Sequence, residues 1–387
     1  MRTLIISDLH LGASSHGDLL RRPELREPLL DALDGVDRLV LLGDVLELRH
    51  GPVREALAAA EPVFTAIGQR LAGRELVLVA GNHDHALIGP WIARRGEDAG
   101  TPPLALEQLL EPAAASPGYE RIARWAAPAR VVVAYPGLWV RPDVYATHGH
   151  YLDAHLTVPT LERLSIGVMS RVLRKPASEL ATVDDYESLG APVFAWRDAV
   201  ARDGETGSAL NGMATVGAWR ALGGAASSRR AKGGDSRVRS LRDALLRRAF
   251  VAGFPLAVAA LNRAGLGPVR AEVSGAELRR AGLLAMGEVA AHLGLADVDV
   301  VFGHTHRAGP LPADTATEWV GRSGARLVNC GTWTYAGIFV GASPEASPYW
   351  PGAAVLVEDA RAPQVLRLLS DRTREELRPP RLTRAPA

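Results

Sequence analysis

The stretch RTLIISDLHLG (residues 2–12) begins with a short apolar run and continues with two potential metal ligands, Asp8 and His10. An apolar run of this length that stops at a polar residue is typical of a buried strand. The same arrangement recurs in RLVLLGD (38–44) and ELVLVAGNHDH (75–85), and a segment with helical spacing separates these two runs. The strand–helix–strand order predicts a largely parallel sheet covered on both faces. In such sheets, ligands bind beyond the carboxyl ends of the strands.

Further strands are expected on either side of a long middle segment. Turn residues separate the runs at 129–140 and 143–150, which indicates a hairpin that feeds a further strand. Four later runs also have the pattern of strands: residues 297–303, 325–331, 353–358 and 364–369. We therefore expect an α/β core in two parts, residues 1–157 and 296–370. A mostly helical insertion at 158–295 would separate these parts, and a loosely ordered tail at 371–387 would follow them.

Composition and charge restrict the class of protein. Hydrophobic residues make up 47% and charged residues 22% of the chain, as in an ordinary globular protein. The formal net charge of +1 gives no basic field, so a nucleic-acid partner is not expected. The single cysteine, Cys330, excludes an intramolecular disulfide and favours a reducing compartment. The N-terminal apolar run is too short for a signal peptide, so we expect a cytoplasmic protein.

The insertion leaves a question about partners open. Residues 160–175 and 275–295 have the pattern of helices, and residues 203–236 are rich in Gly, Ala and Ser, which indicates a flexible segment. Arginines at 237–248 precede an apolar stretch at 249–265, which is shorter than the ~20 residues of a membrane-spanning helix. This part is either a helix with a solvated face or a helix that makes a peripheral contact with a membrane surface. No pattern indicates an obligate protein partner.

Potential metal ligands lie at the ends of the expected strands. They are carboxylate, carboxamide and imidazole groups: Asp8, His10, Asp44, Asn82, His83, Asp84, His85, His148, His150, His304 and His306. This mixture suits divalent manganese, iron, zinc or cobalt better than calcium, and the absence of thiolates argues against a structural zinc site. Asp44 stands alone after a glycine at a strand end, which suits a carboxylate that bridges two ions.

Five sequence blocks, in their order along residues 8–306, resemble the calcineurin-like metallophosphoesterase family: Asp-x-His, Gly-Asp, Gly-Asn-His-Asp, a histidine motif and Gly-His-x-His. The resemblance implies a four-layer αββα sandwich. It also implies two divalent metal ions, manganese first, with iron, zinc, cobalt or nickel as alternatives.

The same resemblance implies a role for each matching residue. One ion would be bound by Asp8, His10, Asp44 and His306, and the other by Asp44, Asn82, His148 and His304. His83 would be the catalytic histidine, with Asp84 orienting its ring. Three further residues beside these motifs are candidates for contact with substrate: His85, His150 and Arg307. His150 is also an alternative to His148 as a ligand.

The implied reaction is hydrolysis of a phosphoester or pyrophosphate bond by a hydroxide that bridges the two ions. The motifs SDLHLGA and THGHYLD are similar to the branch that contains UDP-2,3-diacylglucosamine hydrolase. The chain departs from that branch at His83, at His150 and in its long insertion, so the phosphate-containing substrate stays open between a small molecule and a lipid nucleotide. A metal-dependent nuclease or phosphodiesterase is the alternative enzyme, and a non-catalytic scaffold of the same fold is the alternative outside enzymes.

Overall fold

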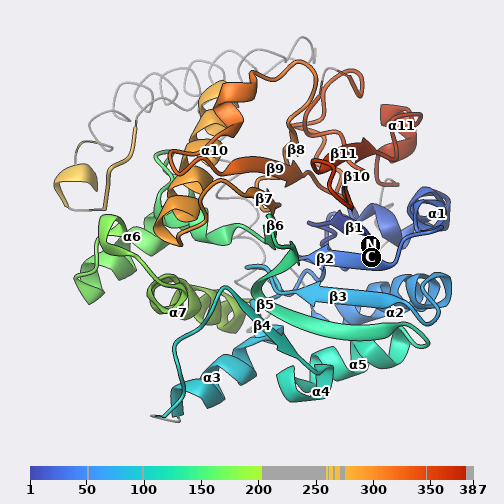
Figure 1. Cartoon of the computed structure of the whole chain (residues 1–387), viewed down its shortest axis with the longest axis horizontal. Helices are drawn as coiled ribbons and strands as arrows, with labels where there is room; N and C mark the ends of the chain where they lie inside the picture. Colours follow the sequence, from blue (N-terminus) through green and yellow to red (C-terminus); the bar gives the residue numbers. More distant parts are fainter. Residues whose placement is uncertain are drawn as a thin grey trace, which may run out of the picture.

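The computed structural model describes residues 1–49, 52–97, 100–202, 259, 261–264, 266–270, 275–345 and 347–380 (Figure 1). Its strands are β1 (Arg2–Ile6), β2 (Arg38–Leu42), β3 (Glu75–Val79), β4 (Glu107–Leu110), β5 (Arg130–Arg141), β6 (Val144–Thr147), β7 (Asp299–Phe302), β8 (Ala308–Gly309), β9 (Arg326–Cys330), β10 (Ala353–Glu358) and β11 (Gln364–Arg367). Its α-helices are α1 (Pro23–Ala32), α2 (Val53–Arg70), α3 (Gly89–Glu97), α4 (Pro112–Ala115), α5 (Pro117–Trp125), α6 (Leu161–Leu173), α7 (Val183–Arg202), α10 (Gly275–His292) and α11 (Arg374–Leu377). Two 3₁₀ turns matter for the site, η2 (His85–Leu87) and η3 (His150–Ala154).

The strands form one hydrogen-bonded path with the order β11-β10-β1-β2-β3-β5-β6-β7-β9-β8, and β4 pairs with β5. Neighbours among β1, β2, β3 and β5 are parallel, and so are those among β6, β7 and β9. The antiparallel hairpin of β5 and β6 joins these two groups. The predicted parallel sheet and the predicted hairpin are both confirmed.

Three separate hydrophobic cores show that this sheet folds onto itself. In β2, Leu41 belongs to an outer core and Leu42 to a central one, because successive side chains of a strand point to opposite faces. The central core joins strands from both halves of the sheet, with Val77 of β3 and Val301 of β7 in one cluster. Two sheet layers therefore face each other across this central core.

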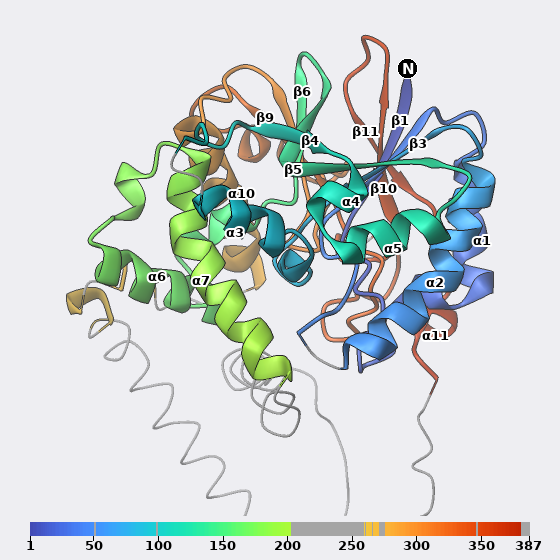
Figure 2. The same cartoon turned by 90° about the horizontal axis from the view of Figure 1, so that it is seen from below.

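Helices cover the two outer faces. Leucines of α1 and apolar residues of α2 and α5 form one outer core with β1, β2 and β3, while α6, α7 and α10 form the other with β6, β7 and β9. Figure 2 shows the two groups of helices on opposite sides of the molecule. The architecture is thus a four-layer αββα sandwich, as the resemblance implied.

The expected insertion contributes helices to this sandwich. Residues 160–175 and 275–295 contain α6 and α10, and no strand is assigned within the described part of residues 158–295. Met286 of α10 is fully buried against the second outer core, so this helix is a layer of the sandwich as well as part of the insertion. The expected flexible segment at 203–236 and most of the expected basic and apolar helix at 237–265 lie outside the described residues. Among the described helices, none is long and apolar enough to cross a membrane.

Part of the expected loosely ordered tail, residues 371–380, lies within the described residues. Residues Arg374–Leu377 form α11, which begins with a capping box between Thr373 and Glu376. Leu377 is completely buried in the first outer core, and Arg22 donates a hydrogen bond to the carbonyl of Glu376. One buried leucine and one cap hold this segment against the core, and a polar sequence pattern does not reveal them.

We predict that Leu377→Ala lowers the free energy of unfolding by about 2–5 kcal/mol, the usual effect of removing a buried leucine side chain. Urea denaturation measures this, with Leu109→Ala as the control, because Leu109 is 60% exposed. Equal stability of the two variants would show that α11 does not pack on the core in solution.

Candidate metal centre

Loops from both halves of the sheet meet at one place. The segments after β1, β2 and β3 lie beside those after β6 and β7, at the carboxyl ends of these strands. Backbone hydrogen bonds join the first two loops, from Asp8 N to Gly43 O at 3.1 Å and from His10 N to Asp44 O at 2.9 Å. The parallel topology therefore gathers ligands that are almost 300 residues apart.

The first ligand set is gathered around Asp8. His306 Nε2 lies 3.1 Å from Asp8 Oδ1 and 3.3 Å from His10 Nε2. His10 Nε2 also lies 3.8 Å from Asp44 Oδ2. Asp8, His10 and His306 each present one ligand atom, and these atoms lie within 4.8 Å of one another. Four oxygen and nitrogen atoms thus converge where one divalent cation fits.

The second ligand set shares the same oxygen of Asp44. His148 Nε2 lies 3.4 Å from Asp44 Oδ2, and the ligand atoms of Asp44, His148 and His304 lie within 4.8 Å of one another. The side-chain amide of Asn82 lies 3.1 Å from His148 Nε2 and 3.0 Å from His304 Nδ1. Asp44 Oδ2 is therefore common to both sets, as a bridging ligand would be.

Asn82 is the one member of these sets whose side chain has two competing orientations. Hydrogen bonding within the protein favours the amide oxygen on the side of Arg49, whose Nη1 lies 2.9 Å away, with the NH₂ group facing Asp44 and the two imidazoles. Coordination of a cation requires the opposite orientation, with the oxygen facing His148 and His304. A half-turn of the amide about its Cβ–Cγ bond exchanges the two arrangements.

Five of the seven residues in the two sets have a left-handed backbone. The φ angles are 57° at Asp8, 46° at His10, 51° at Asp44, 64° at His304 and 58° at His306. This conformation is uncommon outside glycine and costs of order 1–3 kcal/mol per residue. Such strain persists only where the surrounding fold enforces it, and it concentrates at functional sites.

The two aspartates have one oxygen anchored by the protein and one directed into the cluster. Asp8 Oδ2 accepts hydrogen bonds from the Ser7 hydroxyl and, at 3.0 Å, from His304 N. Asp44 Oδ1 accepts from His83 N at 2.7 Å. The free oxygens, Oδ1 of Asp8 and Oδ2 of Asp44, are the atoms that face the histidines.

Close packing behind the aspartates explains two of the glycines. A Cβ at Gly81 would overlap the carboxylate and backbone nitrogen of Asp44, and a Cβ at Gly303 would overlap the side chains of Ser7 and Asp8. Glycine is therefore required at both positions by the space available.

Outer hydrogen bonds fix which nitrogen of each histidine is free to bind a cation. His10 Nδ1 lies 3.1 Å from Glu47, His148 Nδ1 lies 2.9 Å from the carbonyl of Leu42, and His304 Nε2 lies 3.1 Å from Asp153. Each contact places the ring proton on the nitrogen that points away from the cluster. The lone pair of the other nitrogen then points inward, as in other metal-binding histidines.

The electrostatic potential at the cluster is negative. Burial lowers the pKa of His10, but the hydrogen bond to Glu47 and the charges of Asp44 and Glu47 raise it, to about 9 overall. Burial also lowers the pKa of His148, and Asp44 raises it to about 10. Carboxylates that favour a proton on buried imidazoles equally favour a divalent cation in the same place.

Glu47, which the sequence analysis did not single out, holds the predicted catalytic histidine. Its Oε2 lies 2.9 Å from His83 Nδ1. Burial lowers the pKa of His83 to about 4, although the charges of Glu47 and Asp44 oppose this shift. His10, Asp44 and His83 also lie close enough to form a third trio of ligand atoms.

The structure corrects the role expected for Asp84. Its two oxygens accept hydrogen bonds from backbone groups, namely Gly81 N and Val45 N at 2.7 Å each and Leu46 N at 3.3 Å. Asp84 thus pins the loops after β2 and β3 to each other. The contact with His83 that we expected from Asp84 is made by Glu47.

The three candidate substrate contacts divide into two groups. Arg307 lines a cavity above the cluster, together with Asp44, Asn82, His83, His304 and His306. His85 lies instead under α7, where its Nε2 is 3.3 Å from Glu187 and its ring packs on Phe194. His150 is buried against Tyr151 and Phe194. His85 and His150 therefore pack beneath α7, and the sequence could not show which helix covers them.

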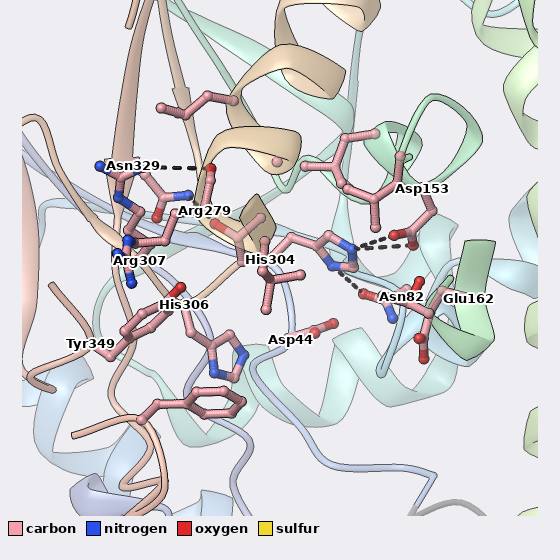
Figure 3. Close-up of a pocket in the computed structure, with 18 of the residues that line it drawn as sticks. Asp44, Asn82, Asp153, Glu162, Arg279, His304, His306, Arg307, Asn329 and Tyr349 are labelled. Carbon is pink, nitrogen blue, oxygen red and sulfur yellow. Dashed lines mark hydrogen bonds and ion pairs between the residues drawn. The ribbon is translucent and has the colours of Figure 1, made fainter. Parts of the chain in front are cut away.

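The cavity has a volume of about 260 Å³. Its apolar wall comes mainly from η3 and α10: Leu152, Leu156, Leu278, Leu283 and Trp319. Figure 3 shows His304 and His306 at its centre, Asp153 and Glu162 at one side, and Arg279, Arg307 and Tyr349 at the other. The candidate metal centre thus lies in a pocket large enough for a small organic phosphate.

Comparison with known proteins agrees with this site. Residues 1–189 match the sequence model of the calcineurin-like phosphoesterases. His304 and His306 lie beyond the matched region. That region carries seven of the candidate ligand and catalytic residues: Asp8, His10, Asp44, Asn82, His83, Asp84 and His148. The match and the αββα sandwich support a metal-dependent hydrolase of phosphoesters at the general level. No curated protein matches the chain in a comparison of sequences.

We predict that Gly81→Ala weakens manganese binding about tenfold or more, because the new methyl group displaces the carboxylate of Asp44. Isothermal titration calorimetry with MnCl₂ measures the affinity. Gly96→Ala is the control, since a Cβ at Gly96 meets nothing within 4 Å. Unchanged affinity in the Gly81 variant would mean that Asp44 does not take part in binding.

Proposed function

We propose that this chain is a phosphoesterase of the calcineurin-like type that works with two divalent cations. The observation that carries the proposal is the sharing of Asp44 Oδ2 between two ligand sets, with His10 Nε2 at 3.8 Å and His148 Nε2 at 3.4 Å. The resemblance of the five blocks and the match over residues 1–189 support the same class. Manganese is the first cation we propose; the carboxylate, amide and imidazole ligands, without thiolate, also accept iron, zinc or cobalt.

The residues have distinct roles in this proposal. Asp8, His10, Asp44 and His306 hold one cation, and Asp44, Asn82, His148 and His304 hold the other. Bound cations would supply a more acidic water and would neutralise charge on a phosphoryl group. Glu47 orients His83, which lines the cavity and can exchange a proton or a hydrogen bond with the reacting phosphate ester.

The proposed substrate is a small phosphate ester or anhydride. A cavity of about 260 Å³ with an apolar wall suits a compact organic group beside the phosphate. A lipid nucleotide, as in the branch containing UDP-2,3-diacylglucosamine hydrolase, would have to extend beyond this space. We retain the cytoplasm as the expected location, on the basis of the single cysteine.

An activity panel tests the proposal with the purified protein and MnCl₂. It contains p-nitrophenyl phosphate, bis(p-nitrophenyl) phosphate, a UDP-sugar and single-stranded DNA. We expect turnover of at least one of the three small substrates and its loss in EDTA. Cleavage of DNA alone would favour the nuclease, and no turnover of any substrate with any of the candidate metals would favour the scaffold.

We predict that Asp44→Asn abolishes turnover and removes both manganese ions, because the variant lacks the shared negative oxygen. Metal analysis after gel filtration gives the number of ions per chain. Asp31→Asn is the control, since Asp31 is an exposed partner of Arg70 far from the cavity. A fully loaded and active Asp44 variant would contradict the shared-ligand arrangement.

We predict that His83→Ala keeps both ions and lowers kcat about 100-fold or more, the usual range for a group that transfers a proton. Glu47→Gln should lower kcat less and also weaken the ion on His10, because Glu47 contacts both imidazoles. Steady-state kinetics and metal analysis separate the two effects. If His83→Ala turns over as the wild type does, the role assigned to His83 is wrong.

A further inference from the structure

One end of the cavity carries an excess of positive charge. Arg279 of α10, Arg307 after β7 and Tyr349 line it together, next to His306 (Figure 3). These residues come from three segments that the fold brings together, and Arg279 and Tyr349 belong to none of the motifs in the sequence.

The protein neutralises this charge only in part. Arg307 Nη2 pairs with Asp314 at 2.6 Å, and its guanidinium lies over the ring of Trp319 at 4.7 Å. Arg307 is only 5% exposed, and its Nε is buried without a hydrogen-bond partner. Within the described ranges, no carboxylate pairs with Arg279. Two guanidinium groups therefore face the cavity against one carboxylate, and a buried donor without an acceptor is costly.

Tyr349 supplies a hydroxyl at the same end. Burial raises the pKa of Tyr349, and the positive charges of Arg279 and Arg307 partly offset this shift. The phenol thus stays protonated and can donate a hydrogen bond close to both arginines. Its ring packs on Phe339 at 5.5 Å, which fixes its position on the cavity wall.

The opposite end of the cavity has no such excess. Asp153 contacts His304 at 3.1 Å, and Glu162 pairs with the buried Arg197 at 2.6 Å. The acidic side chains there are satisfied within the protein. An anionic ligand would therefore be attracted to the end with the arginines.

We propose that Arg279, Arg307 and Tyr349 form a subsite for a second anionic group of the substrate, a carboxylate or a second phosphate. The inference rests on the proposed function, because the first phosphoryl group would lie at the metal centre. Guanidinium groups suit this task, since their planar set of N–H donors matches the oxygens of carboxylates and phosphates. The preferred substrate would then be a phosphate compound with two anionic groups, and a simple monoester would be a poor one.

Three phosphonates that cannot be hydrolysed test this subsite: propylphosphonate, 3-phosphonopropionate and propane-1,3-diphosphonate. The first has one anionic group, the second adds a carboxylate, and the third adds a phosphonate. Isothermal titration calorimetry on the manganese-loaded protein gives each Kd, and inhibition of p-nitrophenyl phosphate hydrolysis gives an independent Ki. The wild type should bind at least one of the two longer anions about tenfold more tightly than propylphosphonate, the effect of roughly one charge-assisted hydrogen bond.

The variant Arg279→Gln should lose that preference while its Kd for propylphosphonate stays unchanged. Arg280→Gln is the matched control, because it removes the same charge from the neighbouring, exposed position of α10. Equal Kd values for all three compounds in the wild type would overturn the subsite. So would an Arg279 variant that weakens propylphosphonate as much as the longer anions.

The outcomes also separate the subsite from the proposed function. If propylphosphonate binds and p-nitrophenyl phosphate is hydrolysed, but the second anionic group adds nothing, only the subsite fails. If no phosphonate binds and no phosphate ester is hydrolysed, the proposed function fails with it. The arm that binds more tightly, carboxylate or phosphonate, identifies the chemistry of the second group.

Discussion

The carboxylate of Asp44 is the constraint on which the site depends. Two divalent cations a few ångströms apart repel each other strongly, and a shared negative oxygen between them reduces that repulsion. The protein prepares this oxygen by fixing its neighbour: Asp44 Oδ1 accepts the N–H of His83, which leaves Oδ2 between His10 and His148. The residue is buried, with a left-handed backbone, and no side chain at Gly81 competes for its space. Together these features hold Asp44 Oδ2 where both ligand sets can share it.

Packing in the sandwich offsets the free-energy cost of this strained backbone. Five ligand residues with positive φ cost of order 1–3 kcal/mol each, a sum comparable to the net stability of a domain. Three apolar cores and parallel strands on both sides hold the loops in that conformation. Outer contacts from Glu47, Asp153 and the carbonyl of Leu42 then set the orientation of the imidazoles. The site is thus the result of a rigid frame and several anchoring hydrogen bonds.

Much of this could be predicted from the sequence, because the strands are short apolar runs and the ligands follow them directly. Asp8, Asp44 and His304 are placed by strand ends alone, and parallel neighbours bring those ends together.

The contact of Glu47, rather than Asp84, with His83 could not be predicted, since turn geometry decides which of two nearby acids reaches His83. An acid three residues after Asp44 was the available signal. The packing of His85 and His150 could not be predicted, because a helix distant in sequence, α7, covers them. Arg279 was missed for a related reason, because only the packing of α10 brings it to the cavity.

The central claim is that two cations share Asp44, and anomalous diffraction from a crystal of the manganese-loaded protein tests it most directly. The account predicts two anomalous peaks roughly 3.5–4 Å apart, both within bonding distance of the Asp44 carboxylate. One peak should lie near His306 and the other near His304. A single peak, or peaks away from Asp44, would contradict the account.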